Sequence, residues 1–286
     1  MKIKLVTFSD GSFGLRAAGK RLVKQADTTG WFDYPSEHWT LETLRSKMPD
    51  FFIKHENFLK AHQKGLGLWI WKSAILAYQI EQLEENEIVL ILDAGCQINS
   101  TKESESRFKD YIDFCNQNDI LLMQIPENAF GIDDLSDAAW TKLFVLESLD
   151  PYSLHRKTNQ IQSGIIFAKK SPRSQQIAKK WSYYCQELDY KFILDPSPNE
   201  LQSCNFKQHR WEQSILSLLI KAEGIVPMLD ETYFYPRWEE GAGFPIWTMR
   251  NRSGGDAYRR NLMDLLKLLT AKIERKMINL FRKTHS

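Results

Sequence analysis

Short apolar, β-branched runs alternate along this chain with longer segments in which apolar residues recur every three or four positions. The apolar runs have the pattern of buried strands and occupy residues 3–8, 87–92, 119–125 and 162–170. Helical spacing occurs in residues 15–26, 69–85, 104–118, 138–149, 172–188 and 209–224. Between residues 41 and 62 the same spacing is interrupted by Pro49, which predicts two helices or one kinked helix. This alternation predicts an α/β domain with a largely parallel sheet flanked by helices, which binds ligands beyond the carboxyl ends of its strands.

The chain has 286 residues, of which 43% are hydrophobic, and this is enough for a substantial core. The formal net charge of +2 argues against a nucleic-acid partner, because no basic patch with interleaved aromatic residues precedes the C-terminus. The N-terminal residues lack the long apolar stretch of an export signal, and no apolar run has the length of a membrane span. The four cysteines form no C-x-x-C pair, which indicates isolated thiols in a reducing compartment. We therefore expect a cytoplasmic location.

Asp93 follows the run IVLIL and precedes Ala94 and Gly95, so its carboxylate is expected at a strand end beside a small-residue turn. Such a position suits a divalent ion, Mn²⁺ or Mg²⁺, that bridges a diphosphate, because these ions bind one or two carboxylates plus phosphate oxygens. The alternative is a turn aspartate without a ligand, since an isolated D-x-G is a weak motif.

Five further blocks occur in the order seen in bacterial polysaccharide-type glycosyltransferases, which this chain resembles: GLGLWIWKSAIL, LILDAGCQIN, QIQSGIIFAKKS, HRWEQSILSLL and FPIWTMRNRS. The opening VTFSDGSFGLRAAGKRLVKQA is similar to their first strand, nucleotide loop and helix, so the resemblance runs from the N-terminus to about Ser253. The arrangement is also similar to the retaining glycogenin and galactosyltransferase superfamily. The resemblance implies a Rossmann-like GT-A domain over residues 1–253, followed by a basic amphipathic C-terminal helix over residues 254–286.

The resemblance also implies roles for individual residues. Asp93 would hold the metal and the diphosphate, and the acidic residue Glu212, with Gln213, would lie near the anomeric carbon as a catalytic group. The residues that would bind the nucleotide-sugar or its phosphates are Thr7, Phe8, Ser9, Asp10, Arg16, Lys72, Asp93, Ala94, Gly95, Ser163, Gly164, Arg210, Arg250 and Arg252. The usual D-x-D metal motif is reduced here to Asp93-Ala94-Gly95, and no convincing histidine ligand follows it.

Several of these residues also have ordinary structural interpretations. Lys72 and Arg210 fit phosphate binding or, equally, surface positions, and His209 fits a helix-start histidine better than a ligand. Glu212 fits an inverting base, an orienting group in a retaining enzyme, or a first-turn glutamate favoured by the helix dipole. The segment 250–252 is either a phosphate-closing loop or a solvated basic turn. Trp69 and Trp71 diverge on a helix, so we expect at least one of them to pack in the core.

The tail from Arg259 to Lys283 has apolar residues on one side and many lysines and arginines on the other. This pattern fits packing against the domain or a partner subunit, or contact with the inner face of an anionic membrane.

The expected function is transfer of a hexose, most simply from a UDP-sugar, to a glycan or lipid-linked acceptor in surface-polysaccharide or capsule synthesis. A catalytically silent nucleotide-sugar or glycan-binding module on the same fold is the alternative. A nucleotidyltransferase is disfavoured because the segment 11–14 is too sparse in glycine for its phosphate loop.

Overall fold

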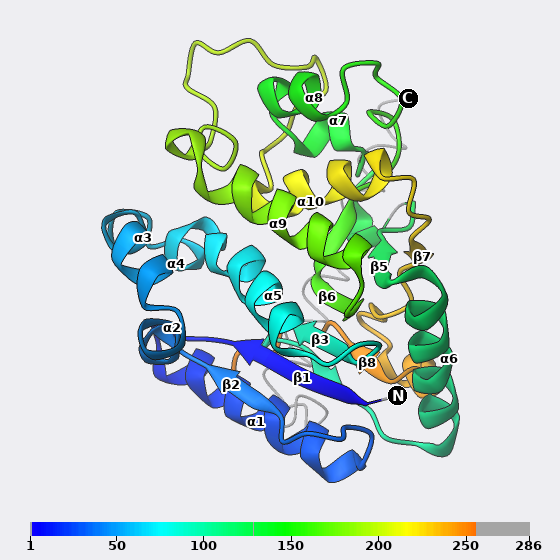
Figure 1. The fold of residues 1–286 in the computed structure, drawn as a ribbon. Coiled ribbons are helices and arrows are strands. Elements are labelled where there is room, and N and C mark those ends of the chain that lie inside the picture. Colours follow the sequence, from blue (N-terminus) through cyan, green and yellow to red (C-terminus); the bar gives the residue numbers. More distant parts are fainter. Residues whose placement is uncertain (1, 128, 256–286) are drawn as a thin grey trace, which may run out of the picture.

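A six-stranded sheet forms the centre of the molecule in the computed structural model, which describes residues 2–127 and 129–255 (Figure 1). Its strand order is β2-β1-β3-β6-β5-β7. The strands are β1 (Ile3–Phe8), β2 (Glu37–Trp39), β3 (Ile88–Leu92), β5 (Ile120–Gln124), β6 (Ile161–Lys169) and β7 (Met228–Leu229). Within this sheet only β6 runs antiparallel to its neighbours, β3 and β5. The other five described strands of the sheet share one direction. The expected α/β architecture with a mostly parallel sheet is confirmed.

Two hydrophobic clusters lie on the two faces of the sheet because alternate residues of each strand point in opposite directions. Val89 and Ile91 of β3 join the cluster that contains residues of α5, α9 and α10. Leu90 and Leu92 join the cluster that contains residues of α1 and α6. The helices are α1 (Phe13–Thr29), α2 (Leu41–Lys47), α3 (Pro49–Ala61), α4 (Gly65–Leu68), α5 (Ile70–Gln82), α6 (Lys102–Asn118), α7 (Asp137–Trp140), α8 (Leu143–Leu149), α9 (Pro172–Gln186) and α10 (Trp211–Ala222). Short 3-10 turns occupy Ala129–Gly131, Leu188–Tyr190 and Trp238–Gly241, and a separate two-stranded sheet pairs β4 (Gln97–Ile98) with β8 (Ile246–Trp247).

Two expected helices differ from the structure, one at its first residue and the other by a break in the middle. The segment 69–85 becomes α5 only from Ile70, because Trp69 has a left-handed backbone with φ of 62°. The segment 138–149 separates into α7 and α8 at Thr141, whose backbone is extended. The carbonyl of Trp140 there accepts hydrogen bonds from the backbone N–H of Arg210 at 3.1 Å and the hydroxyl of Ser214 at 2.7 Å. These donors come from distant parts of the chain, so the local helical pattern does not reveal the break.

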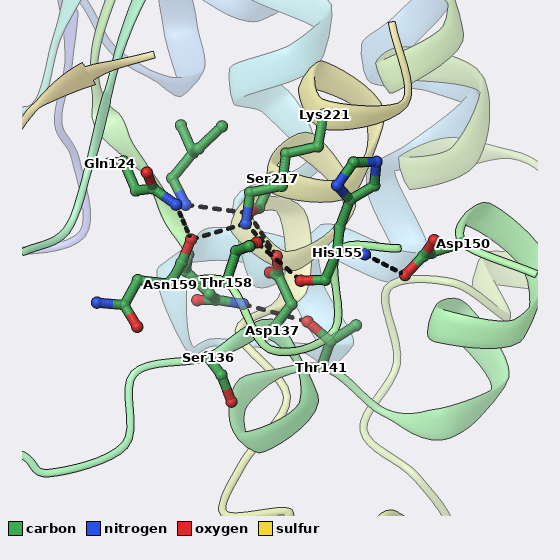
Figure 2. Close-up of polar contacts among 12 residues, drawn as sticks. Gln124, Ser136, Asp137, Thr141, Asp150, His155, Thr158, Asn159, Ser217 and Lys221 are labelled. Atoms are coloured by element: carbon green, nitrogen blue, oxygen red, sulfur yellow. Dashed lines mark hydrogen bonds and ion pairs between the residues drawn. The ribbon is translucent and has the colours of Figure 1, made fainter. Parts of the chain in front are cut away.

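A buried polar cluster joins α10 to α7 and to the segment before β6 (Figure 2). Lys221 forms an ion pair with Asp137, and its ammonium also donates to the carbonyl of Asn159 at 2.7 Å. Ser217 donates from its hydroxyl to the same Asp137 carboxylate at 3.2 Å. Because Ser217 and Lys221 lie on one face of α10, these bonds fix the rotation of that helix and hence the direction of the side chains in its first turn.

No helix among residues 2–127 and 129–255 combines the length and the apolar character needed to cross a bilayer. The expected C-terminal helix lies outside the described residues from position 256 onward.

Candidate functional site

The polar residues singled out from the sequence gather at the carboxyl edge of the sheet. Asp93 comes directly after β3, and the loop from Ser9 comes directly after β1. Because β6 runs in the opposite direction, its first residues reach this edge, and they include Ser163 and Gly164. In sheets of this kind, ligands bind beyond the carboxyl ends of the parallel strands.

Lys72 is the centre of this group. Its side chain is 2% exposed, and its ammonium lies 2.9 Å from Asp93 Oδ1 and 3.4 Å from Glu212 Oε1. It also donates to the carbonyl of Ser163 at 3.2 Å. Burial by itself lowers the pKa of Lys72, but the charges of Asp93 and Glu212 outweigh this effect, so the pKa is raised and the ammonium stays charged. Three segments far apart in the sequence are therefore joined by one buried cation.

The two carboxylates bound by Lys72 differ in exposure. The side chain of Asp93 is 46% exposed, whereas that of Glu212 is 5% exposed. Glu212 Oε1 also accepts a hydrogen bond of 2.8 Å from the hydroxyl of Ser163. Burial raises the pKa of Glu212, and Lys72 and Ser163 partly offset this effect. Asp93 thus faces solvent with Lys72 and Glu212 behind it.

Gly164 leaves room for the carboxylate of Asp93. A Cβ at position 164 would lie 3.1 Å from Asp93 Oδ2, a contact tighter than nearly all real Cβ contacts. The backbone N–H of Asp93 donates to the carbonyl of Gly164 at 2.9 Å. The glycine of the Ser163-Gly164 pair therefore allows β6 to pass close to the Asp93 side chain.

The residues present do not fit a divalent cation at Asp93. One oxygen of this carboxylate already binds the ammonium of Lys72 at 2.9 Å, so only the other oxygen could bind a metal. Within residues 2–127 and 129–255, no group of three or more histidine, cysteine, aspartate or glutamate side chains is arranged to hold a metal ion. Charge at this edge is balanced by side chains instead.

Two arginines lie beside this group without a carboxylate partner among the described residues. The guanidinium of Arg210 lies 4.2 Å over the ring of Trp140, and that of Arg250 lies 5.2 Å over the ring of Phe130. Burial lowers the pKa of Arg210, and the nearby charge of Arg250 lowers it further. Two like charges held close together disfavour each other unless an anion binds between them. Arg252 is exposed, and its carbonyl lies against Gly14.

Arg21 is a structural residue of this edge that the sequence interpretation missed. Its buried guanidinium donates to the carbonyls of Ala94 at 2.9 Å and Cys96 at 3.0 Å, on either side of Gly95. It also donates to the carbonyl of Ser253 at 3.2 Å. Arg21 therefore joins the turn after Asp93 to the segment 250–253. The sequence pattern that could have indicated a buried Arg21 is its position beside Leu22 and Ala18, on the apolar face of α1.

The residues assigned to the nucleotide loop are buried or mostly bind other parts of the protein. Thr7 is fully buried, and the ring of Phe8 packs 4.0 Å from that of Trp71. The hydroxyl of Ser9 donates to the carbonyl of Leu15 at 2.7 Å. Asp10 accepts a hydrogen bond of 2.9 Å from the backbone N–H of Leu41, and it pairs with the exposed Arg16 at 3.3 Å. These contacts place the four side chains from Thr7 to Asp10 in the framework of the loop.

Trp69 and Trp71, at the start of α5, and Gln213 on α10 have structural contacts. Trp71 is buried against Phe8, and the partly buried Trp69 lies 5.4 Å from the ring of Trp211. Gln213 donates from its side-chain amide to that of Gln160 at 2.8 Å. The expectation that at least one tryptophan packs in the core is confirmed.

His209 is a neutral structural residue and not a phosphate-binding cation. It is fully buried, its Nδ1 accepts from the backbone N–H of Lys142 at 3.4 Å, and its Nε2 is 2.9 Å from the carbonyl of Phe192. The first bond requires an unprotonated Nδ1, so Nε2 carries the proton that is donated to Phe192. Burial, together with the charge of Lys142, lowers the pKa of His209 to about 3.

This pKa predicts a loss of stability in acid. The unfolded chain binds a proton at His209 below pH of about 6.5, while the folded chain does not until about 3. The contribution of His209 is therefore fully present above about 6.5 and falls as the pH decreases through this window, by up to about 1.4 kcal/mol per pH unit. Urea unfolding at several pH values measures the effect, and His209→Gln is expected to flatten the dependence. An unchanged slope in this variant would contradict the assignment.

Comparison with known proteins gives structural likenesses only. No protein-family model and no curated protein matches the chain. A glycosyltransferase involved in glycosylation of the major capsid of PBCV-1 is 14% identical, with a TM-score of 0.45 over 86% of this chain and 92% of that one. Mouse xyloside xylosyltransferase 1 is 8% identical, with a TM-score of 0.44 over 91% of this chain and 100% of that one. The galactosyltransferase LgtC is 12% identical, with a TM-score of 0.39 over 85% and 86%. All three TM-scores lie below 0.5, so the function is inferred from the residues of the site.

Proposed function

We propose that this chain is a glycosyltransferase that moves a sugar from a nucleotide-sugar to a hydroxyl of a glycan or lipid-linked acceptor. The observation that carries the proposal is the half-exposed carboxylate of Asp93, fixed from behind by the buried Lys72 at the carboxyl edge of the sheet. Beside it are the two guanidinium groups of Arg210 and Arg250, which have no carboxylate partner among the described residues.

The chemistry of transfer needs both signs of charge at one place. The bond between the anomeric carbon and the phosphate oxygen breaks, a bond forms from the anomeric carbon to the acceptor oxygen, and the proton of the acceptor hydroxyl passes to an oxygen of the departing diphosphate. Positive charge grows on the sugar during this step, while negative charge grows on the diphosphate. In this proposal the exposed oxygen of Asp93 stabilises the oxocarbenium-like sugar. Arg210 and Arg250 supply the cations for the diphosphate, because arginine is suited to bidentate phosphate binding, while the buried Lys72 orients Asp93 from behind.

Glu212 acts in this proposal as a positioning residue. A base that accepts a proton from the acceptor must come within hydrogen-bond distance of its hydroxyl. The side chain of Glu212 is 5% exposed, and one of its oxygens already binds Ser163 and Lys72. This burial favours the orienting role over the role of an inverting base. Glu212 keeps Lys72 charged and directed toward Asp93.

The finer features of the proposal rest on the sequence resemblance. They are a UDP-hexose donor, an acceptor in surface-polysaccharide or capsule synthesis, and a cytoplasmic enzyme. The basic amphipathic pattern of residues 259–283 supports peripheral contact with a membrane and hence a lipid-linked acceptor.

A panel of nucleotide-sugars tests the proposal. Thermal shift identifies the donors that bind the native state, and release of the nucleotide measures turnover. Turnover by the wild type that is lost in Asp93→Ala, with donor binding retained, supports the enzyme. A wild type that binds a donor but never releases nucleotide, with any acceptor glycan, supports the silent binding module. A chain that binds no nucleotide-sugar contradicts both functions.

Binding of a nucleoside diphosphate is expected to need no divalent ion. Because one oxygen of Asp93 already binds Lys72 and two arginines are placed to bind the diphosphate, UDP should bind in EDTA about as tightly as with added Mn²⁺. Arg250→Gln is expected to weaken UDP binding about tenfold or more, since a charged hydrogen bond contributes about 1.5–3 kcal/mol. Isothermal titration calorimetry measures both effects.

The control for this prediction is Arg237→Gln. Arg237 is an exposed arginine nearby in the sequence, and it pairs with Glu240 at 2.8 Å. Its loss should leave the affinity for UDP unchanged. Binding that appears only with Mn²⁺ would show that a metal ion, and not the two arginines, balances the diphosphate.

A further inference from the structure

A pocket of about 310 Å³ lies at the carboxyl ends of β5 and β7. Its lining includes Pro126, which follows β5, and Asp230, which follows β7, together with Phe130, Tyr233 and Tyr235. Pockets for small molecules typically measure about 300–1,000 Å³, so this one suits a ligand of about one ring. None of the site residues expected from the sequence lines it.

The lining of the pocket is aromatic with one carboxylate. The ring of Tyr233 meets that of Phe130 edge-to-face at 4.5 Å, and Tyr235 is 6.3 Å from Tyr233. Tyr235 is 49% exposed, so much of its surface is open to a ligand. Aromatic rings in such walls pack against the apolar faces of a ligand, while a few polar groups bind its edge.

The two carboxylate oxygens of Asp230 differ, because one accepts hydrogen bonds from the protein and the other is left for a ligand. Its Oδ1 accepts from the backbone N–H of Thr232 at 2.9 Å and from the hydroxyl of Thr232 at 2.6 Å. Among the described residues, Oδ2 accepts no hydrogen bond. An ionised carboxylate only accepts, so its ligand must donate, as hydroxyl groups do. C–H faces together with a hydroxyl edge are the surface of a pyranose.

The pocket is joined to Asp93 through Arg250. The guanidinium of Arg250 lies over Phe130, in the wall of the pocket, at 5.2 Å. The backbone of Arg250 lies against the turn after Asp93, because a Cβ at Gly95 would be 3.2 Å from its Cα. In the strand order, β5 and β7 lie on the opposite side of β3 from β1. The pocket and the loop after β1 therefore flank Asp93.

We infer that this pocket binds a pyranose ring of the acceptor, with a ring hydroxyl donating to Asp230 and the reacting hydroxyl directed toward Asp93. The inference rests on the proposed function for the identity of the ring as an acceptor. The β1 loop, which the sequence resemblance assigns to the nucleotide, lies on the other side of Asp93, and Arg250 over Phe130 places the ring next to the diphosphate.

Binding of methyl hexopyranosides to the full chain tests the inference without any donor. Saturation-transfer NMR with a panel of these glycosides gives the affinities of the wild type, Tyr235→Ala and Asp230→Asn. Each variant is expected to weaken binding about three- to tenfold, because one aromatic or hydrogen-bonding contact is lost. Asp230→Asn keeps an oxygen for the two Thr232 bonds, so the turn is preserved.

Tyr183→Ala is the matched control, since Tyr183 on α9 is 48% exposed, almost the same as Tyr235. Donor hydrolysis without acceptor is measured in parallel and should be unchanged in both pocket variants, while the KM for an acceptor rises. The inference would be overturned if none of the glycosides binds, or if Tyr183→Ala weakens glycoside binding as much as Tyr235→Ala does. Competition between uridine and the glycoside for one site would also overturn it. Donor hydrolysis by the wild type would be unaffected by these outcomes, so the proposed transferase would not be contradicted. An absence of donor binding together with intact glycoside binding would contradict the proposed transferase instead.

Discussion

Lys72→Met is expected to lower the free energy of unfolding by about 3–5 kcal/mol, because it leaves the buried carboxylate of Glu212 without its cation. Both partners are almost fully buried, with side chains 2% and 5% exposed. Methionine keeps much of the volume of the lysine stem, so the loss reports charge more than a cavity. Denaturant unfolding at neutral pH measures the change.

Removal of the charge on Glu212, which has lost its lysine partner in Lys72→Met, should restore stability. The double variant Lys72→Met/Glu212→Gln is expected to recover most of the loss, since a neutral amide can still accept the hydrogen bond from Ser163. Lys169→Met is the matched control, because Lys169 pairs with Asp119 at 3.0 Å where both side chains are more exposed. Its expected cost is below about 1 kcal/mol. Equal losses in the two single variants would contradict a special role for the Lys72 cluster.

Asp93→Asn is expected to reduce sugar transfer about 100- to 1,000-fold while hardly changing stability. The loss follows from removal of the negative charge that faces the sugar, and contributions of this size are typical for a group that stabilises charge in a transition state. The side chain of Asp93 is 46% exposed, and Glu212 still pairs with the buried Lys72 in this variant, so the loss of folding stability should be small. Nucleotide release at saturating donor gives kcat, and thermal unfolding gives stability.

The control for Asp93 is Asp110→Asn. Asp110 is also an exposed aspartate, and it pairs with Arg107 at 3.1 Å on α6. Turnover should remain at the wild-type level in this variant. If Asp93→Asn keeps full turnover on every donor that binds, the carboxylate has no part in the reaction and the proposed mechanism fails.

The sequence predicts the elements well where a local pattern is sufficient. The strands at 3–8 and 88–92 and the helices around residues 104–118 and 172–186 follow from apolar spacing alone. Spacing does not encode strand direction, so the antiparallel run of β6 between β3 and β5 could not be predicted. The break between α7 and α8 also depends on donors that arrive from α10 and its N-terminal flank.

The candidate site was predictable in its residue types but not in its geometry. Asp93, Lys72 and Glu212 were all selected from the sequence, and the structure brings them together. Which of the two carboxylates is exposed depends on packing between β6 and α10, and no local pattern records that. Asp230 was overlooked for the same reason, because its importance comes from aromatic residues of two separate loops.

The hydrogen bonds of Arg21 couple the turn after Asp93 to residues 251–253. Arg21 binds carbonyls on both sides of Gly95 and the carbonyl of Ser253, and Asn251 binds Gly95 through its backbone N–H at 2.9 Å. A displacement of residues 251–253 is therefore transmitted within a few bonds to the turn that follows Asp93, without any ligand entering that turn.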